Sequence, residues 1–592
     1  METSHSTSLQ RIEQPLPYPN LSLGDRAGFA VANFAYSNDL IPGARKLGLP
    51  AVVRNSFLIL SLLLGLFFST LDTSIIATSL ITISIEFHDH ANAPWILLAY
   101  LLTYMGCSVG VAKLSDIYGR RTVLFYSWGI FLTFSAGCTG APNMPTLIIC
   151  RAFKGIGGAG LYSLAQICLL EHGPARNPSL MGALIGITLA LAFLLGPILG
   201  GAITSRVSWR WIFAINIPFG CLATLCILLF FPVEHRAHSI LSLKALRKID
   251  FIGMISLLSA SVTLVFGIER GGARVYSWDH KAIISSFVVS GISWIVFICW
   301  EIHLNKTYCQ LTDHRRCRHV EPVFTAKLAR RRPYICGLIV AFLTGAPYVV
   351  LTVAIPERMQ VLQHENPLNA GVHLLPMLTG TAVGSFLAGA ICRKHNHTAF
   401  LMIMSSAMQV IGVSLMLLLT DVESSFVPAY GFTLIVGLGV GVSFGASTIV
   451  AAVEDDKAVA QGAIAQARVL GSCLGLSICT VLFNNRLDAI IQHLTKEQLA
   501  TLQQTPTASA DWPDGLLRRI QEVYIIAFRD QTVFLTCISG IMLVTAICAF
   551  ERSPKPISSA ADAQRALKAS QQGGRYDNHG TEMSDMASVR SA

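Results

Sequence analysis

The chain has 592 residues, of which 53% are hydrophobic and only 13% are charged. Soluble proteins carry about 25% charged residues, so this composition excludes a soluble enzyme and any disordered or fibrous class. The formal net charge is +10. A basic chain is a candidate for nucleic-acid binding, but in a membrane protein Lys and Arg collect in the cytosolic loops. The positions of the charges decide between these interpretations.

Residues 1–55 are polar and contain no apolar stretch typical of a cleaved signal peptide, so we expect a cytosolic N-terminal tail. Fourteen apolar runs follow, each at or near the length of about 20 residues that a helix needs to cross a bilayer. They are predicted at 56–85, 94–112, 121–140, 146–170, 180–204, 211–231, 250–269, 281–302, 333–355, 368–392, 399–420, 426–453, 461–483 and 531–550. The alternative is a count of 12 or 13, because 250–269 and 281–302 are the weakest runs.

The basic residues are distributed unequally between the two sides of this predicted topology. Fourteen spans place both termini on one side, and the short loops on that side hold 19 Lys and Arg, against 5 on the other side. Because cytosolic loops are the basic ones, both termini are predicted to be cytosolic. The net charge is thereby explained, and no nucleic-acid partner is expected. The sequence predicts a multi-pass protein, which we expect in the plasma membrane.

The spans group into two halves of six. The predicted parts are the tail 1–55, a first bundle 56–231, a basic linker with two extra spans 232–332, a second bundle 333–550 with an outer loop 484–530, and a cytosolic tail 551–592. Two six-span halves indicate an internal duplication with a cavity between them. The expected fold class is therefore an all-α membrane protein with two six-helix bundles and two linker helices.

Charged residues inside spans are costly and mark candidate functional positions. Asp72 is the only carboxylate deep in a predicted span, while Arg151, Lys154 and Arg468 are interior cations. Arg151 and Lys154 lie three residues apart and share a helix face. An aspartate whose neighbouring arginine moves away in one conformation could take up and release a proton. We expect this acid, Asp72, to lie in the pocket between the halves. The alternative is that the interior charges only pair with one another and hold helices together.

Two further motifs stand at fixed places among the spans. The segment 112–121 joins spans 2 and 3, and 192–201 lies in span 5. In the first, a glycine permits a tight turn and an aspartate can pair with arginine; in the second, proline favours a kink and glycines permit close helix packing. The residues singled out are Asp116, Gly119, Arg120 and Arg121 in the loop, and Gly196, Pro197, Gly200 and Gly201 in the span.

Several other sites are excluded by context. Gly155–Gly160 matches G-x-G-x-x-G, but it lies in an apolar helix without the acidic residue that a dinucleotide site needs, so helix packing explains it. There is no phosphate-binding G-x-x-x-x-G-K-[ST], no pair of catalytic carboxylates and no nucleophile elbow. Cys309, His314, Cys317 and His319 are possible ligands by type, but their spacing fits no standard metal site. We expect no enzyme activity, no cofactor and no metal.

These motifs together resemble those of the major facilitator superfamily, and most of all its 14-span drug:proton antiporters, especially the exporters of filamentous fungi. The resemblance covers about 56–550. It rests on Leu71-Asp72-Thr73, the loop Leu114–Arg121, the span-4 segment Arg151–Gly158, Trp209–Pro218 and the span-5 segment Gly196–Gly201. This chain departs from the family pattern at Ala112 and Ala192, where glycine is usual, and at Lys154, where glutamine is usual.

The resemblance implies a proton-driven exporter of small amphipathic compounds, such as a drug, toxin or secondary metabolite, that works by alternating access. It implies proton coupling by Asp72 and Arg151, a lock formed by Asp116 against the helix that begins near Gln461, and a seal formed by span 5. The alternative on the same fold is a proton-coupled importer of an iron chelate or nutrient. A membrane sensor is less expected, because the predicted tails are short.

Substrate contacts can only be proposed from depth in the spans. The candidates are Tyr104, Lys154, Gln166, Phe342, Tyr348, Gln409 and Arg468. The extra cation Lys154 indicates an anionic or acidic substrate. The expected partners are a small organic substrate, protons and the lipid bilayer, and the protein is expected to be a monomer.

Overall fold

A computed structural model describes residues 51–89, 92–172, 178–231, 250–310, 324, 326–363, 365–392, 395–418, 427–454, 457–491 and 514–551. Within these ranges, 14 helices are long and apolar enough to cross a membrane, which confirms the predicted number. Residues 1–50 and 552–592 of the predicted tails, the loop 232–249 and the possible metal ligands His314, Cys317 and His319 lie outside the described residues. Residues 51–55, predicted as the end of the N-terminal tail, instead begin the first helix.

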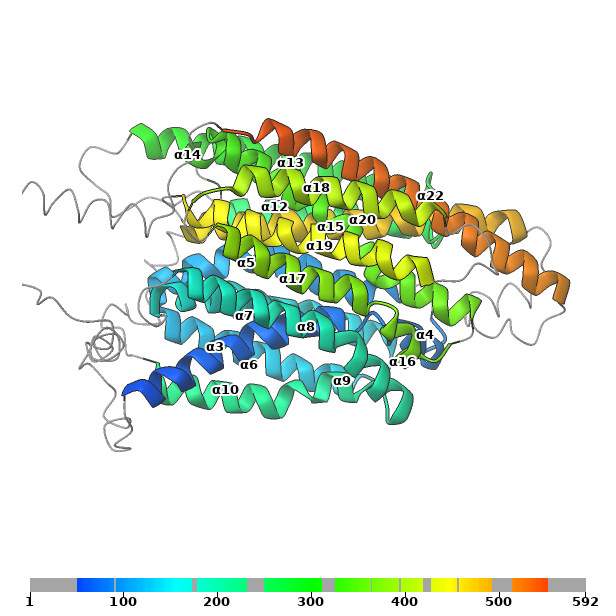
Figure 1. Cartoon of the computed structure of the whole chain (residues 1–592), viewed down its shortest axis with the longest axis horizontal. Coiled ribbons are helices and arrows are strands. Elements are labelled where there is room, and N and C mark those ends of the chain that lie inside the picture. Colours follow the sequence, from blue (N-terminus) through cyan, green and yellow to red (C-terminus); the bar gives the residue numbers. More distant parts are fainter. Residues whose placement is uncertain are drawn as a thin grey trace, which may run out of the picture.

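The long helices run side by side along the longest axis of the molecule (Figure 1). The first six are α3 (Ala51–Ser74), α5 (Pro94–Tyr118), α6 (Arg120–Thr139), α7 (Met144–His172), α8 (Pro178–Arg206) and α10 (Asn216–Phe230). The linker holds α12 (Phe251–Gly272) and α13 (Lys281–Gln310). The last six are α15 (Arg332–Leu362), α17 (Leu375–Ile391), α18 (Thr398–Leu415), α19 (Val427–Ala452), α20 (Lys457–Ile491) and α22 (Asp514–Cys548). The short helices are α4 (Leu80–Glu86), α9 (Trp211–Ala214), α14 (Ala326–Ala329), α16 (Pro367–Val372) and the 3-10 helix Met416–Leu418.

The helix pairing of the first half is repeated in the second. The first long helix of each half packs against the fifth, as α3 with α8 and α15 with α20. The second packs against the fourth, as α5 with α7 and α17 with α19. Across the halves, the second helix of each contacts the fifth of the other, as α5 with α20 and α8 with α17. This reciprocal pairing is the arrangement that an internal duplication produces.

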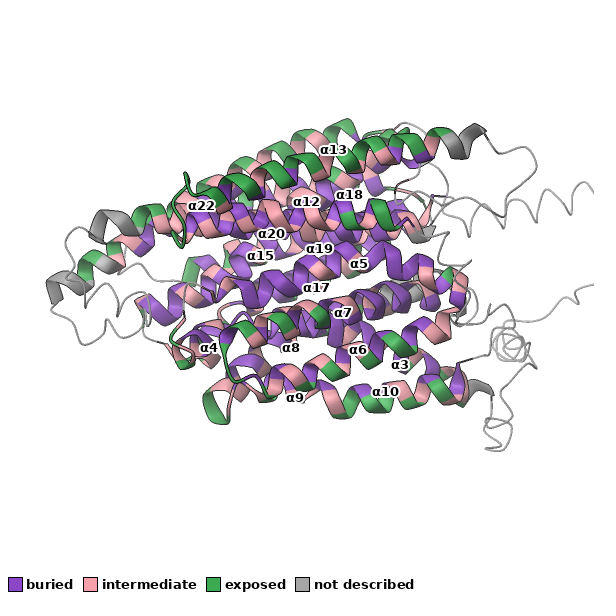
Figure 2. Cartoon of the chain, turned by 180° about the vertical axis from the view of Figure 1, so that it is seen from behind, coloured by how far each residue is buried: buried purple, intermediate pink, exposed green. Residues whose placement is uncertain are grey.

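The two linker helices lie outside these bundles. Helix α12 packs against α5 of the first half and α20 of the second, while α13 packs mainly against α12. Helix α13 is largely exposed along its length (Figure 2), and its outward side chains include Ile284, Ile292 and Ile295. An apolar, unpartnered helix face is stable when lipid covers it. The two weakest predicted spans are therefore helices of spanning length at the edge of the fold.

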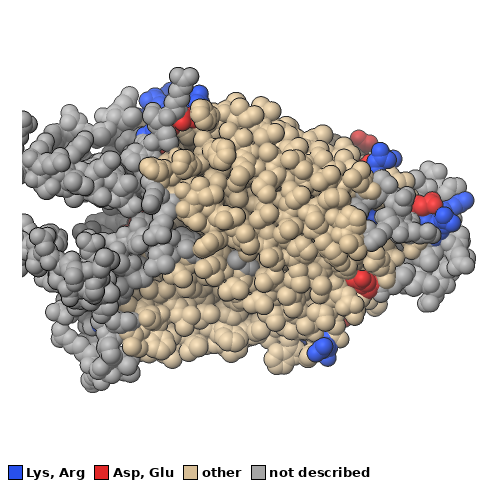
Figure 3. All heavy atoms as spheres, in the orientation of Figure 1, with Lys and Arg blue, Asp and Glu red and all other residues tan. Residues whose placement is uncertain are grey.

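The surface carries the charge pattern of a membrane protein. On the face drawn in Figure 3, described Lys, Arg, Asp and Glu side chains lie toward the two ends of the molecule, and the band between is free of them. Helix α3 begins and helix α22 ends at the same end of the bundle (Figure 1). An even number of spans requires this arrangement.

Two predicted boundaries differ in the structure. The run 56–85 is not one helix, because α3 ends at Ser74 and turns lead into α4. At the break, the hydroxyl groups of Thr73 and Ser74 donate to the carbonyls of Thr70 and Leu71, at 2.7 and 3.2 Å. Such local bonds compete with the helical ladder. At the other end of the chain, α20 and α22 both extend into the predicted outer loop 484–530.

Candidate functional site

A buried ion cluster joins α3 to α7. Asp72 is 1% exposed, and Arg151 and Lys154 are fully buried. Arg151 Nη1 donates to one carboxylate oxygen of Asp72, and Lys154 Nζ donates to the other at 2.5 Å. The amide of Asn216 on α10 lies 3.5 Å from the same carboxylate. Because Arg151 and Lys154 are three residues apart on α7, both reach one partner, as the spacing predicts.

Aromatic rings contact both cations of this cluster, and among the described residues no second acid pairs with them. Lys154 Nζ lies 4.6 Å from the ring centre of Phe131 and 5.1 Å from that of Phe213. The Arg151 guanidinium lies 4.3 Å from the ring centre of Tyr100. Its Nε also donates to the carbonyl of Ile96 at 2.9 Å. Ring faces attract cations most strongly where water is excluded, so these contacts offset part of the cost of burying a net positive cluster.

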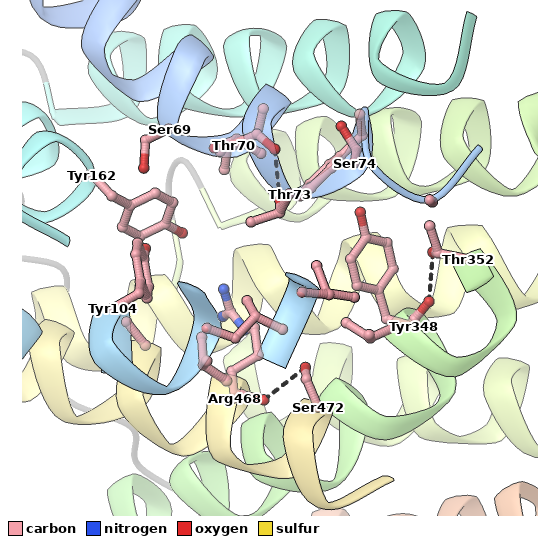
Figure 4. Close-up of a pocket in the computed structure, with 18 of the residues that line it drawn as sticks. Ser69, Thr70, Thr73, Ser74, Tyr104, Tyr162, Tyr348, Thr352, Arg468 and Ser472 are labelled. Carbon is pink, nitrogen blue, oxygen red and sulfur yellow. Dashed lines mark hydrogen bonds between the residues drawn. The ribbon is translucent and has the colours of Figure 1, made fainter. Parts of the chain in front are cut away.

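A cavity lies between the two halves, lined by α3, α5, α7 and α8 on one side and by α15, α19 and α20 on the other. Hydroxyl groups from both halves line it, and Figure 4 shows Tyr104, Tyr162 and Tyr348 with Arg468 among them. The apolar part includes Phe193, Phe444 and several aliphatic side chains. Among the described lining residues, Arg468 is the charged one. An apolar pocket with a few convergent polar groups is typical of small-molecule sites.

Asp72 does not line this cavity, and the expectation that the shared pocket holds it is wrong for this conformation. Helix α3 instead presents Ser69, Thr70, Thr73 and Ser74 to the cavity. Asp72 lies on a different face of the same helix, turned toward α7 inside the first half. The acid and the cavity are therefore separate sites on one helix.

Three of the residues proposed from depth line the cavity, namely Tyr104, Tyr348 and Arg468. Lys154, Gln166, Phe342 and Gln409 do not. Lys154 is held by Asp72, and Gln166 accepts a hydrogen bond from Gln461 of α20 at 2.8 Å. Both residues have the expected depth but face another helix.

Phe342 and Gln409 face neighbours within the second half. The carbonyl of Phe342 lies directly against Gly471, where α15 and α20 pack closely. Gln409 is completely buried in α18 beside Gly439, and neither of its amide atoms has a hydrogen-bond partner. Sequence reasoning also missed the hydroxyls of α3, although their i, i+3, i+4 spacing beside Asp72 would have indicated one polar helix face.

The loop motif builds the turn between α5 and α6. Gly119 has a φ of 88°, a left-handed conformation that glycine adopts without strain, so the chain can reverse there. Asp116 pairs with Arg120 at 2.6 Å, and Arg120 also donates to Ser115. Arg121 donates to the carbonyl of Leu228 on α10 at 2.7 Å. The loop is thereby fixed to the first half, and the lock between Asp116 and α20 stays a prediction.

The motif of span 5 lies where α3 ends. Ser74 donates to the carbonyl of Ala192 at 3.1 Å, and a Cβ on Gly196 would come within 2.7 Å of the Ser74 Cβ. A Cβ on Gly200 would lie 2.3 Å from the carbonyl oxygen of Ile75. Glycine at these two positions therefore permits contact between α8 and the end of α3. The proline between them, Pro197, lies inside α8.

The same motif reaches the other half of the protein. A Cβ on Gly201 would lie 2.6 Å from the Cα of Leu368 in α16, which leaves no room for a side chain. Beside the cavity, Gln466 of α20 also donates to the carbonyl of Met105 in α5 at 2.9 Å. The two halves thus touch at the α8 motif and between α5 and α20.

Comparison with known proteins supports the interpretation of these motifs. The sequence profile described as Major Facilitator Superfamily matches residues 62–476. The MFS-type transporter FPY5 of Fusarium mangiferae is 34% identical over 513 residues, which cover 84% of this chain and 83% of that protein. Efflux pump aflT of Aspergillus parasiticus is 29% identical over 457 residues, covering 75% and 83%.

A solved structure shares the fold. The bacterial homologue of the human lysosomal transporter Spinster, in an inward-facing and unoccupied conformation, matches with a TM-score of 0.52 at 13% identity. The match covers 84% of this chain and 97% of that one. Together with the profile match, this confirms the predicted all-α fold, in which the described residues form 14 helices of spanning length. The chain is a multi-pass membrane transporter, not an enzyme, and belongs to the major facilitator superfamily.

Proposed function

We propose that this transporter exports small amphipathic organic compounds in exchange for protons, by alternating access. The cavity between the halves is the substrate site, and the cluster of Asp72, Arg151 and Lys154 is the proton-coupling site. The name of the relative aflT, an efflux pump, supports export over import. We further propose that a monomer works in the plasma membrane with both termini in the cytosol.

The observation that carries this proposal is the position of α3. This helix presents four hydroxyl residues to the cavity and Asp72 to the ion cluster. The helix ends at Ser74, which packs against the α8 motif, and this motif in turn contacts α16 of the other half. A rearrangement at Asp72 therefore reaches both the substrate site and the contact between the halves through one continuous set of packed elements.

Proton binding at Asp72 requires that its two cations release the carboxylate. In this conformation both oxygens are occupied, by Arg151 and Lys154. A second conformation in which α7 moves relative to α3 would free the acid for a proton. Because breaking a buried ion pair is costly without a substitute partner, proton binding and helix movement favour each other. This linkage is what an exchanger needs to couple two fluxes.

The energy available is sufficient for export. One proton moving down about 100 mV releases roughly 2.3 kcal/mol. One pH unit adds about 1.4 kcal/mol. Their sum can sustain a gradient of a few hundredfold for a neutral solute, by the rule that about 1.4 kcal/mol is a factor of ten. No nucleotide-binding segment is required.

The test uses the full chain in liposomes with an imposed pH gradient and the dye phenylnaphthylamine as the transported probe. We expect the dye to move against the direction of the protons and to stop when an ionophore collapses the gradient. Asp72→Asn should abolish gradient-driven movement. Dye movement in the same direction as the protons would instead establish an importer, and movement independent of the gradient would contradict proton coupling.

A further inference from the structure

Arg468 is an interior cation that no acid in the described part of the chain neutralises. Its Nη2 donates to the hydroxyl of Ser447 at 2.9 Å, and its guanidinium carbon lies 4.0 Å from the ring centre of Phe444. Its Nε is buried and has no hydrogen-bond partner. No ion pair joins Arg468 to a carboxylate among the described residues. The guanidinium of Arg468 thus contacts a neutral hydroxyl and an aromatic ring rather than a described carboxylate.

This environment differs from that of the two cations in the ion cluster of the first half. Arg151 and Lys154 share the carboxylate of Asp72 and lie away from the cavity. Arg468 lines the cavity together with Tyr104 and Tyr348 (Figure 4). A charge at membrane depth is expensive, and such residues are retained where they face a water-filled path or a ligand. An unpaired guanidinium in a substrate cavity therefore calls for an anionic partner from outside the chain.

We propose that the cavity selects organic anions: aromatic or amphipathic compounds that carry a carboxylate or sulfonate. This inference rests on the proposed function and adds the substrate class. The anionic group binds the free face of Arg468, because guanidinium matches the geometry of such oxyanions. The apolar body packs against the rings of Phe193, Tyr348 and Phe444, while hydroxyl groups of α3 satisfy further polar atoms.

In this proposal the anion preference comes from Arg468 and not from Lys154. The extra lysine of α7 is held by Asp72 and is fully buried, so it is not available to a substrate in the cavity. Selection for an anion is also favoured by what the cavity lacks, since no described lining residue is acidic. A cationic compound would meet the unpaired guanidinium and would be repelled.

The test measures binding of two dyes to the purified full chain in lipid nanodiscs by equilibrium dialysis, with empty nanodiscs as the blank. Anilinonaphthalene sulfonate and phenylnaphthylamine share one ring system and differ by the sulfonate. Arg468→Gln should weaken sulfonate binding by about tenfold or more, the effect of losing one charged hydrogen bond. It should change binding of the neutral dye by less than about twofold, which also shows that the cavity is intact.

Two variants complete the design. Arg468→Lys keeps the charge but not the planar guanidinium, and should lower the sulfonate preference less than Arg468→Gln does. Arg206→Gln removes a positive charge from an exposed position at the end of α8 and should leave both affinities unchanged. Equal binding of both dyes by the wild-type protein, or an equal loss for both in Arg468→Gln, would overturn the inference.

The outcome is separable from that of the proposed function. Gradient-driven export of the neutral dye without any preference for the sulfonate would overturn the anion inference and leave the exporter standing. Strong Arg468-dependent sulfonate binding without gradient-driven movement would support the anion site and contradict the proton-driven exporter. Better binding of a cationic dye such as rhodamine than of the sulfonate would also overturn the anion site.

Discussion

The two halves of this transporter hold their interior charges in contrasting ways. In the first half, Asp72, Arg151 and Lys154 form a dry cluster in which each charge has a partner. In the second half, Arg468 is the charged residue among the described residues that line the cavity. Its guanidinium contacts the hydroxyl of Ser447 and the ring of Phe444. Under the proposed function, this contrast is a division of tasks. The first half would store a charge arrangement that a proton can change, and the second would offer a charge that a substrate can neutralise.

The largest expected effect comes from removing the acid of the cluster. Asp72→Asn leaves two buried cations without their counter-ion, which is expected to cost about 3–5 kcal/mol of stability. Asp72→Asn combined with Lys154→Gln restores the original net charge of the cluster. We expect the single variant to unfold at lower temperature than the double variant, and both to lack proton-driven transport. Thermal unfolding and liposome transport measure the two effects; transport by the double variant would contradict the role of Asp72.

The next prediction tests whether the two regions are separable. Lys154→Gln leaves Asp72 paired with Arg151 and does not alter the cavity wall. The preference for anilinonaphthalene sulfonate over phenylnaphthylamine should therefore stay within about twofold of wild type, whereas Arg468→Gln should lower it by about tenfold. Competitive binding of the two dyes gives this ratio directly. A lost preference in Lys154→Gln would return the substrate charge site to α7.

A smaller effect is expected at the contact between the halves. Gly201→Ala places a methyl group against the backbone of Leu368, and overpacking of this kind typically costs about 1–3 kcal/mol. The added methyl group destabilises the conformation in which α8 touches α16. We therefore expect the variant to have a larger effect on the transport rate than on the free energy of unfolding. Gly129→Ala is the matched control, since nothing lies within 4 Å of the added carbon. Equal transport rates in both variants would show that this contact does not limit the cycle.

The smallest effect is expected at Glu86, just beyond the first spanning helix. Its carboxylate accepts from Trp209 Nε1 and Arg210 Nη1, both at 2.5 Å. Burial alone would raise the pKa of Glu86, but the bonds from Arg210 and Trp209 outweigh burial and hold this pKa below its usual value of 4.5. The pair therefore stabilises the fold above that pH, and the contribution disappears as the pH falls through the lowered pKa.

Glu86→Gln should consequently lower the unfolding temperature slightly at pH 7 and have no effect in strong acid. An exposed pair of this kind contributes at most about 1 kcal/mol. Thermal unfolding at both pH values tests the sign. A larger effect in acid than at pH 7 would show that the carboxylate is not stabilised in its charged form.

The comparison also shows what the sequence could and could not predict. The 14 spans follow from apolar length alone, because a bilayer demands it, and even the weak runs at α12 and α13 are spanning helices. The pairing of Arg151 and Lys154 with one partner follows from their i, i+3 spacing. The break after Ser74 could not be read from hydropathy, since the residues that follow are as apolar as the helix itself.

The cavity residues were the least predictable part. Depth along a span does not determine which face of a helix meets the cavity, so Tyr104, Tyr348 and Arg468 line it while Lys154 and Gln166 do not. The rotation of each helix is set by tertiary packing, for example by the attraction of Lys154 to Asp72. A helical-wheel view of α3 would have predicted the hydroxyl face, but not that the opposite half supplies Arg468.

The most direct test of the central claim is the proton flux itself. Liposomes containing the full chain and a trapped pH-sensitive dye are given an outward gradient of anilinonaphthalene sulfonate without any initial pH gradient. The account predicts that sulfonate leaving the vesicles drives protons inward, that the interior acidifies, and that Asp72→Asn combined with Lys154→Gln abolishes the acidification. Sulfonate efflux with no change of internal pH, or an unchanged signal in that double variant, would contradict it.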